Sequence, residues 1–267
     1  MNEETALDIA QVLWLGTLQG LTEFLPISSS AHLALLPRFL HWQDQGQSVD
    51  VFLNIGTLGA LFFYLFRELR MSLRGARDVL FGRKTPEQAF LLKALVATAP
   101  VILAGWIVET FFSSRLKSPT LLASTTVLFS LILLLCDRRP ERPLHKTPLR
   151  DALIIGCAQV FSLLPGASRL GVCLSAMRFL GYDREEAFRF SLFLSFPPVL
   201  GAITLKGIKA IGAGAHPPWD ALMGGCGMAF FWGMMTLGGV LWWLKRGGTW
   251  TPFVAYRLIL AVLVVVL

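Results

Sequence analysis

The chain has 267 residues, of which 54% are hydrophobic and 15% are charged. Mean hydropathy is +0.61, and apolar runs of about 18 to 25 residues match the thickness of a bilayer. This composition excludes an ordinary soluble enzyme and predicts an all-α polytopic membrane protein. The net charge is +7, but the basic residues fall in short segments between apolar runs, where membrane orientation explains them. We therefore expect no nucleic-acid partner.

The first unusual stretch is GTLQGLTEFLPISSSAH, residues 16–32, which places polar and ionisable side chains inside an apolar segment. Residues 7–40 are nearly long enough to cross a membrane and return, and Pro26 is the natural break of a hairpin. Gln19 and Glu23 are four residues apart, so they share one helix face before the break. Placing an ionisable side chain at membrane depth costs free energy, so Glu23 is a candidate functional residue.

After the break, a second short helix is expected, with Ser28, Ser29 or Ser30 as its N-cap and His32 in its first turn. A serine three residues before a histidine allows activation of the hydroxyl, or of a water, for attack on phosphorus. Simpler interpretations are also open. Ser28 could be a plain helix cap, His32 a packing residue, and Glu23 a group that only fixes the hairpin through the serine hydroxyls.

Beyond the hairpin, the chain alternates between apolar runs and polar links. A polar link (41–50) comes first, and two basic loops are expected, at 67–87 and 137–150, with a short turn at 113–118. The apolar runs predict membrane spans at about 50–66, 88–111, 119–136, 187–205, 219–244 and 250–267.

The pattern then repeats, because GCAQVFSLLPGAS at 156–168 echoes GTLQGLTEFLPISS at 16–29. Each half is predicted to be one re-entrant helical hairpin plus three transmembrane helices, at about 7–136 and 150–267 within a single membrane domain. Three crossings are an odd number, so the halves become inverted-topology repeats whose hairpin tips can meet near the midplane.

Loop charge gives an independent test of this topology. With the N-terminus outside, the loops on the cytoplasmic side hold fourteen Lys and Arg residues and the outer loops hold four. The positive-inside rule thus places both termini on the periplasmic side, and the first hairpin opens outward.

The second tip, LLPGASRLGVC, places Ser168 and Arg169 at the start of a half-helix after a Pro-Gly break. A guanidinium at a helix N-terminus is a good phosphate clamp. The alternative is a salt bridge between Arg169 and Glu23 without a substrate. Together the tips offer hydroxyls, an imidazole, a carboxylate, an amide and an arginine. The carboxylate and amide oxygens of Glu23 and Gln19 suit a hard divalent cation such as Mg²⁺ or Ca²⁺.

QGLTEFLPISSSAH and PGASR, in this order and about 140 residues apart, closely resemble the undecaprenyl-pyrophosphate phosphatases of the bacitracin-resistance type. The similarity covers essentially the whole chain, including an FxxYR-like element at 253–257. The resemblance implies removal of the terminal phosphate from a polyprenyl (undecaprenyl) pyrophosphate at the outer face of the bacterial inner membrane. This reaction recycles the lipid carrier for cell-wall synthesis. The resemblance also implies inverted repeats and dependence on a divalent metal.

The family motifs map onto this sequence residue by residue. The [E/Q]xxxE pair falls on Gln19 and Glu23, and the remaining motifs fall on the serine pair, the histidine and the SR dipeptide. We expect catalytic roles for Glu23, Ser29, His32 and Arg169, substrate binding by Ser28, Ser30, Gly166, Ser168 and Arg169, and metal binding by Gln19 and Glu23. The family pattern PGxSRSGxT reads PGASRLGVC here, so Leu170 and Cys173 replace two hydroxyl residues. We expect weaker substrate binding or an altered lipid preference.

A transporter is the competing class, since inverted repeats that meet at the midplane are typical of secondary transporters. Such a protein would move a polyprenyl phosphate across the membrane with weak or no phosphatase activity. Arg169 suits either function, whereas the combination of Glu23, Ser29 and His32 favours chemistry. The expected partners are the lipid substrate and membrane lipids, and a homodimer is one possible assembly.

Overall fold

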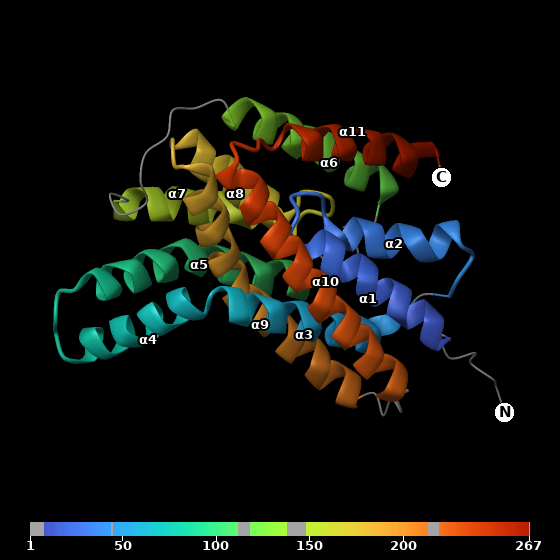
Figure 1. The fold of residues 1–267 in the computed structure, drawn as a ribbon, viewed down its shortest axis with the longest axis horizontal. Coiled ribbons are helices and arrows are strands. Elements are labelled where there is room, and N and C mark those ends of the chain that lie inside the picture. The colour runs from blue at the N-terminus through green and yellow to red at the C-terminus, as the bar shows by residue number, and fades with distance from the viewer. Residues whose placement is uncertain (1–7, 44, 112–117, 138–147, 213–218, 267) are drawn as a thin grey trace.

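The computed structural model describes residues 8–43, 45–111, 118–137, 148–212 and 219–266. Within these residues the structure is helical and contains no strand, which confirms the predicted all-α class. Figure 1 shows the arrangement of the helices. In chain order they are α1 (Ile9–Glu23), α2 (Ser29–Phe39), α3 (Gly46–Tyr64), α4 (Phe66–Leu80), α5 (Pro86–Phe111), α6 (Pro119–Cys136), α7 (Leu149–Val160), the short 3-10 helix η2 (Phe161–Leu163), α8 (Arg169–Phe179), α9 (Arg184–Gly212), α10 (Trp219–Lys245) and α11 (Thr251–Val266).

Each of the six predicted spans coincides with a helix, namely α3, α5, α6, α9, α10 or α11. Among the described residues, four helices are long and apolar enough to cross a membrane: α5, α6, α9 and α10. The helix α3 satisfies the same criterion only together with α4, from which it is bent by 77°. The apolar helix α11 is shorter. The turn at 113–118 lies almost wholly outside the described residues, as does most of the second basic loop.

The first basic segment, expected to be a loop at 67–87, is instead largely the helix α4. Arginine has a high helix propensity, so a charged segment between spans need not be irregular. The helix folds back along α5, as Figure 1 shows. The two backbones approach closely, because a Cβ atom at Gly75 would overlap the carbonyl oxygen of Glu87. Four arginines of α4 (Arg67, Arg70, Arg74 and Arg77) are exposed.

The two helical hairpins pack reciprocally on the other half of the chain. The helix α1 packs against α10, and α7 packs against α5. Both contacts use glycines that lie 140 residues apart: a Cβ atom at Gly16 would overlap the backbone of Gly225, and one at Gly156 would overlap the backbone of Ala97. Small residues of this kind allow helix backbones to approach closely in membrane proteins.

The equivalent glutamines of α1 and α7 make equivalent contacts. Gln19 Nε2 donates to Oδ1 of Asn54 on α3 at 3.4 Å, and Gln159 Nε2 donates to the carbonyl oxygen of Leu194 on α9 at the same distance. In both cases the acceptor lies 35 residues further along the chain. The first helix of each hairpin is thus tied to the first span of its own half.

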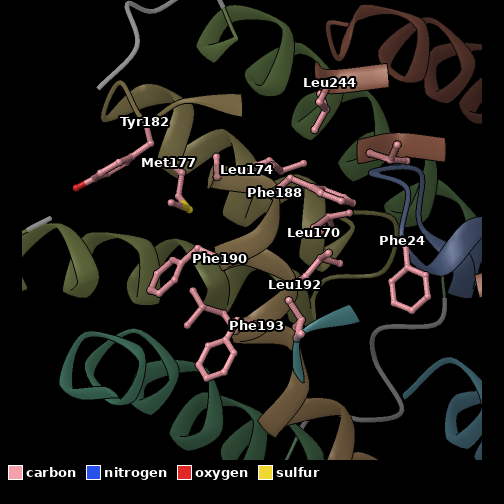
Figure 2. Close-up of a cluster of buried hydrophobic side chains, with 14 of the residues drawn as sticks. Phe24, Leu170, Leu174, Met177, Tyr182, Phe188, Phe190, Leu192, Phe193 and Leu244 are labelled. Carbon is pink, nitrogen blue, oxygen red and sulfur yellow. The ribbon is translucent and has the colours of Figure 1, made fainter. Parts of the chain in front are cut away.

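Apolar side chains next to both helix breaks belong to one hydrophobic core. Figure 2 shows Phe24, which directly follows α1, in the same cluster as Leu170, at the start of α8, and Leu192 of α9. Phe24 is 3% exposed and Leu170 is 4% exposed. Between helices in a bilayer, contacts of such side chains are stabilised by van der Waals packing. The core therefore fixes the positions of both breaks.

Candidate active site

The first tip is the tight break around Pro26 that joins the end of α1, at Glu23, to the start of α2, at Ser29. Ser28 is the N-cap of α2 by position, as one of the predicted alternatives has it, with φ +69° and ψ +84°. This left-handed backbone is uncommon for serine and costs of order 1–3 kcal/mol. The hydroxyl of Ser28 lies 3.2 Å from the hydroxyl of Ser30 and does not cap the helix.

The second tip also has a serine with positive φ at the N-cap, but here the hydroxyl caps the helix. Ser168 is the N-cap of α8, has φ +63°, and accepts a hydrogen bond from the backbone N–H of Gly171 at 3.2 Å. Gly166 has φ +83°, and a Cβ atom there would overlap the backbone and side chains of α6. The hydroxyls of Thr125 and Thr126 on α6 donate to the carbonyl oxygens of residues 165 and 166. A glycine is therefore required structurally at position 166.

One buried arginine joins the two tips. Arg257 of α11 is fully buried and donates from Nη1 to the carbonyl oxygen of Pro26 at 3.0 Å. Its Nη2 donates to the carbonyl oxygens of Gly166 at 2.7 Å and Ala167 at 3.2 Å. Figure 1 shows the loop between α1 and α2 beside the loop that precedes α8. The predicted meeting of the two tips is therefore present in the fold.

A cavity of about 610 Å³ opens at the junction of the tips. Its wall contains the start of both α2 and α8, so the N-terminal, partly positive ends of two helices face one space. The cavity brings together nearly all of the predicted site residues: Gln19, Glu23, Ser28, Ser29, Ser30, Gly166, Ser168 and Arg169.

Glu23 is the centre of the polar contacts in the first tip. Its Oε2 accepts a hydrogen bond from Nε2 of Gln19 at 3.0 Å and another from the hydroxyl of Ser29 at 2.5 Å. The predicted pairing of Gln19 with Glu23 on one helix face is therefore present. The serine hydroxyl lies within the distance at which a carboxylate acts as a general base.

His32 is placed differently from what the sequence spacing suggested. It is buried and does not line the cavity. Its Nδ1 lies 2.8 Å from the carbonyl oxygen of Ser28, and its Nε2 lies 2.7 Å from the hydroxyl of Tyr256. The structure thus brings Ser29 to Glu23 and leaves both nitrogens of His32 bonded elsewhere.

Arg169 lies half-buried in the cavity wall. Among the described residues it makes no ion pair with Glu23, the alternative partner that the sequence left open. Its Nε is buried without a hydrogen-bond partner there. Of the two residues that depart from the family pattern, Leu170 lines the cavity, whereas Cys173 is fully buried outside its wall.

The first tip has the chemistry of a magnesium or calcium ligand set. Oε1 of Gln19 is buried without a hydrogen-bond partner, Glu23 supplies a carboxylate, and Asn54 adds a second amide. Within the described residues no three His, Cys, Asp or Glu side chains gather into a metal cluster. Mg²⁺ commonly uses one or two carboxylates plus substrate phosphates and water, so this donor set fits it.

The family model of the bacitracin resistance protein BacA matches residues 12–263. The chain belongs to this family. It is 40% identical to an undecaprenyl-diphosphatase of Chromohalobacter salexigens over 263 residues, which cover 97% of this chain and 99% of that protein. It is 38% identical to an undecaprenyl-diphosphatase of Marinobacter nauticus, covering 96% of this chain and 97% of the relative. An undecaprenyl-diphosphatase of Jannaschia sp. is 37% identical, with coverage of 95% and 96%.

Three further residues, two of them in the FxxYR-like element of the BacA family, were not assigned to the site from the sequence. Asn54 bonds Gln19, Tyr256 bonds His32, and Arg257 bonds both tips. Arg257 is the only charged residue of α11, and a lone charge in an apolar helix is a signal of function that the sequence did contain. Its partners are separated from it by up to 231 residues, so the sequence could not identify them.

Proposed function

We propose that this protein hydrolyses a polyprenyl pyrophosphate, undecaprenyl pyrophosphate above all, to the monophosphate and inorganic phosphate. The observation that carries the proposal is the hydrogen bond from Ser29 to Glu23 in the same cavity as Arg169. A nucleophile, a base and a phosphate-binding cation thus share one space. The relatives named as undecaprenyl-diphosphatases support the same lipid substrate.

The cavity also matches the two parts of such a substrate. The tips supply hydroxyls, amides and a guanidinium for the pyrophosphate. The walls from α3 and α9 include the apolar residues Leu58, Leu61, Val199 and Ile203, which suit the first units of an isoprenoid chain. A volume of about 610 Å³ is typical of a small-molecule site. The remainder of a long chain would lie among the acyl chains of the bilayer.

In the proposed reaction, Glu23 accepts the hydroxyl proton of Ser29 as its Oγ attacks the terminal phosphorus. The bond between that phosphorus and the bridging oxygen breaks, and the polyprenyl monophosphate leaves. A water then attacks the phosphorus of the phosphoserine, Glu23 returns its proton to the serine oxygen as the P–O bond breaks, and inorganic phosphate leaves with the protons of the water. Arg169 and the N-termini of α2 and α8 neutralise the phosphate oxygens, and such positioning and charge neutralisation dominate phosphoryl-transfer catalysis.

We further propose that Glu23 and Gln19 hold a divalent cation, Mg²⁺ or Ca²⁺, with Asn54 beside them. When bound, the ion would neutralise negative charge on the phosphate groups. The unpartnered oxygen of Gln19 supports this assignment.

We also infer that the halves are inverted repeats with re-entrant hairpins. The reciprocal packing of α1 and α7, the 35-residue hydrogen bonds and the left-handed N-cap serines support the internal repeat. The charge of the loops supports placing both termini on the periplasmic side of the inner membrane. With that orientation the site opens to the periplasm.

Phosphate release by the purified protein tests the proposed function. Wild type in detergent, with undecaprenyl pyrophosphate and Mg²⁺ or Ca²⁺, should release one phosphate per lipid. Ser29→Ala should abolish turnover, whereas Ser124→Ala should not, because the exposed Ser124 bonds only the backbone of α6. Absence of release from folded wild type would contradict the proposal and favour a transporter. Release by Ser29→Ala would identify water as the attacking group.

A further inference from the structure

Two consecutive residues of the helix α11 contact the first tip on the side that does not line the cavity. Arg257 bonds the carbonyl oxygen of Pro26, and Tyr256 bonds His32, which in turn bonds the carbonyl oxygen of Ser28. Neither Tyr256 nor His32 lines the cavity. The reaction proposed above leaves both residues without a function.

The directions of the hydrogen bonds at His32 follow from its partners. A carbonyl oxygen can only accept, so Nδ1, which lies 2.8 Å from the oxygen of Ser28, carries the hydrogen. In the neutral ring Nε2 then holds the lone pair, and the hydroxyl of Tyr256 donates to it at 2.7 Å. The two rings are stacked, with centroids 5.6 Å apart and planes 5° apart. The carbonyl oxygen of Ser28 therefore sets the tautomer of the imidazole, and Tyr256 holds the orientation of its ring.

The carbonyl group that His32 holds belongs to the residue before Ser29. Ser28 has the left-handed φ of +69°, a conformation that persists only where the surroundings enforce it. That carbonyl oxygen also accepts the backbone N–H groups of Ala31 and His32, at 3.1 and 3.4 Å. The imidazole adds a third contact that restrains the backbone of Ser28 and, through it, the hydroxyl of Ser29 relative to Glu23.

We propose that Tyr256 is a positioning residue for the reaction. It acts through His32 on the backbone of Ser28 and thereby keeps Ser29 in contact with Glu23. This inference rests on the proposed function, because it concerns the geometry of the proposed nucleophile. It also places His32 outside the cavity wall, with Nε2 directed toward Tyr256 of α11 and not toward the phosphate groups of the proposed substrate.

Tyr256→Phe is the direct test, because it keeps the stacked ring and removes only the hydroxyl. We expect kcat to fall about tenfold, the effect of one lost hydrogen bond, while KM for undecaprenyl pyrophosphate stays within about twofold. Tyr64→Phe is the matched control, since Tyr64 lies on α3 outside the cavity wall, and it should match wild type. Phosphate release by wild type tests the proposed function separately. Wild-type kcat in Tyr256→Phe would overturn the inference.

A spectroscopic measurement gives an answer that does not depend on activity. In ¹⁵N-histidine-labelled protein, assigned by comparison with His32→Gln, the His32 signals should show hydrogen on Nδ1 and a hydrogen-bonded, unprotonated Nε2. Tyr256→Phe should shift the Nε2 signal and Tyr64→Phe should not. A wild-type ring with hydrogen on Nε2, or an Nε2 signal unaffected by Tyr256→Phe, would contradict the proposal.

Discussion

The hydroxyl of Ser29 donates to Oε2 of Glu23 at 2.5 Å, across the break between α1 and α2. The two residues lie on different helices, so their contact depends on the shape of the tip. This contact is the reason that we propose the carboxylate, rather than His32, as the base in the reaction.

Glu23→Gln should therefore lower kcat about a hundredfold or more, because the amide keeps the size of the carboxylate but can neither accept the proton nor supply the negative charge to the proposed cation. Single-turnover phosphate release measures the chemical step. Glu87→Gln, in the first turn of α5, is the control and should leave kcat unchanged. Activity of Glu23→Gln within a few-fold of wild type would mean that Glu23 is not the base.

Arg169→Lys should reduce kcat/KM about tenfold or more. Lysine keeps the charge but loses the planar fork of donors that matches phosphate oxygens. Steady-state hydrolysis of undecaprenyl pyrophosphate measures the effect, and the exposed Arg150→Lys provides the comparison. If both variants are as active as wild type, Arg169 is a structural residue.

Arg257→Lys should destabilise the protein by about 2 kcal/mol, because an ammonium group cannot reproduce bonds to carbonyl oxygens on both tips. Thermal unfolding in detergent, followed by tryptophan fluorescence, measures the change. Activity should fall together with stability, since the tips form the cavity. The exposed Arg67→Lys on α4 should unfold at the wild-type temperature. An unchanged melting temperature for Arg257→Lys would show that the tips are held by other contacts.

The close helix contacts predict opposite effects for two glycines inside helices. Gly16→Ala should destabilise by about 1–3 kcal/mol, because its Cβ would overlap the backbone of Gly225 on α10. Gly227→Ala should be neutral or stabilising by up to about 1 kcal/mol, since no neighbouring atom lies within 4 Å of the place that its Cβ would take. Melting temperatures of the two variants provide the comparison. Equal effects would contradict the packing of α1 on α10.

The orientation in the membrane can be tested with two cysteines, introduced one at a time into a background without the four native cysteines. A membrane-impermeant maleimide added to intact spheroplasts should label Ser118→Cys, just before α6, and should not label Leu73→Cys. Leu73 is 74% exposed on α4, so burial within the protein would not explain its protection. In inverted vesicles the result should reverse. Labelling of Leu73→Cys from outside would contradict the proposed topology.

The sequence predicted the features that depend on local spacing. The pairing of Gln19 with Glu23 follows from one helical turn, and the break at Pro26 follows from the chemistry of proline. The repeat at 156–168 predicted that a second tip would have the same construction. These features depend only on the spacing of residues that are close in the sequence, so the sequence is sufficient to predict them.

The sequence did not predict the features that depend on contacts between distant elements. The serine-to-histidine spacing suggested that His32 acts on Ser29, but the tertiary structure turns the imidazole toward Tyr256 of α11. The helix α4 was expected to be a loop because its charge concealed its helical pattern. Asn54 and Arg257 acquire their partners only when helices from different parts of the chain pack together.

The link made by Arg257 also determines when the site can be assembled during biosynthesis. Its partners precede it by 231 residues at Pro26 and by 91 residues at Gly166. Both hairpins are therefore synthesised before the residue that ties them together exists. Until α11 is inserted, the nascent protein holds two unjoined tips, so a ribosome-bound intermediate that lacks α11 should contain the hairpins but not a stable cavity.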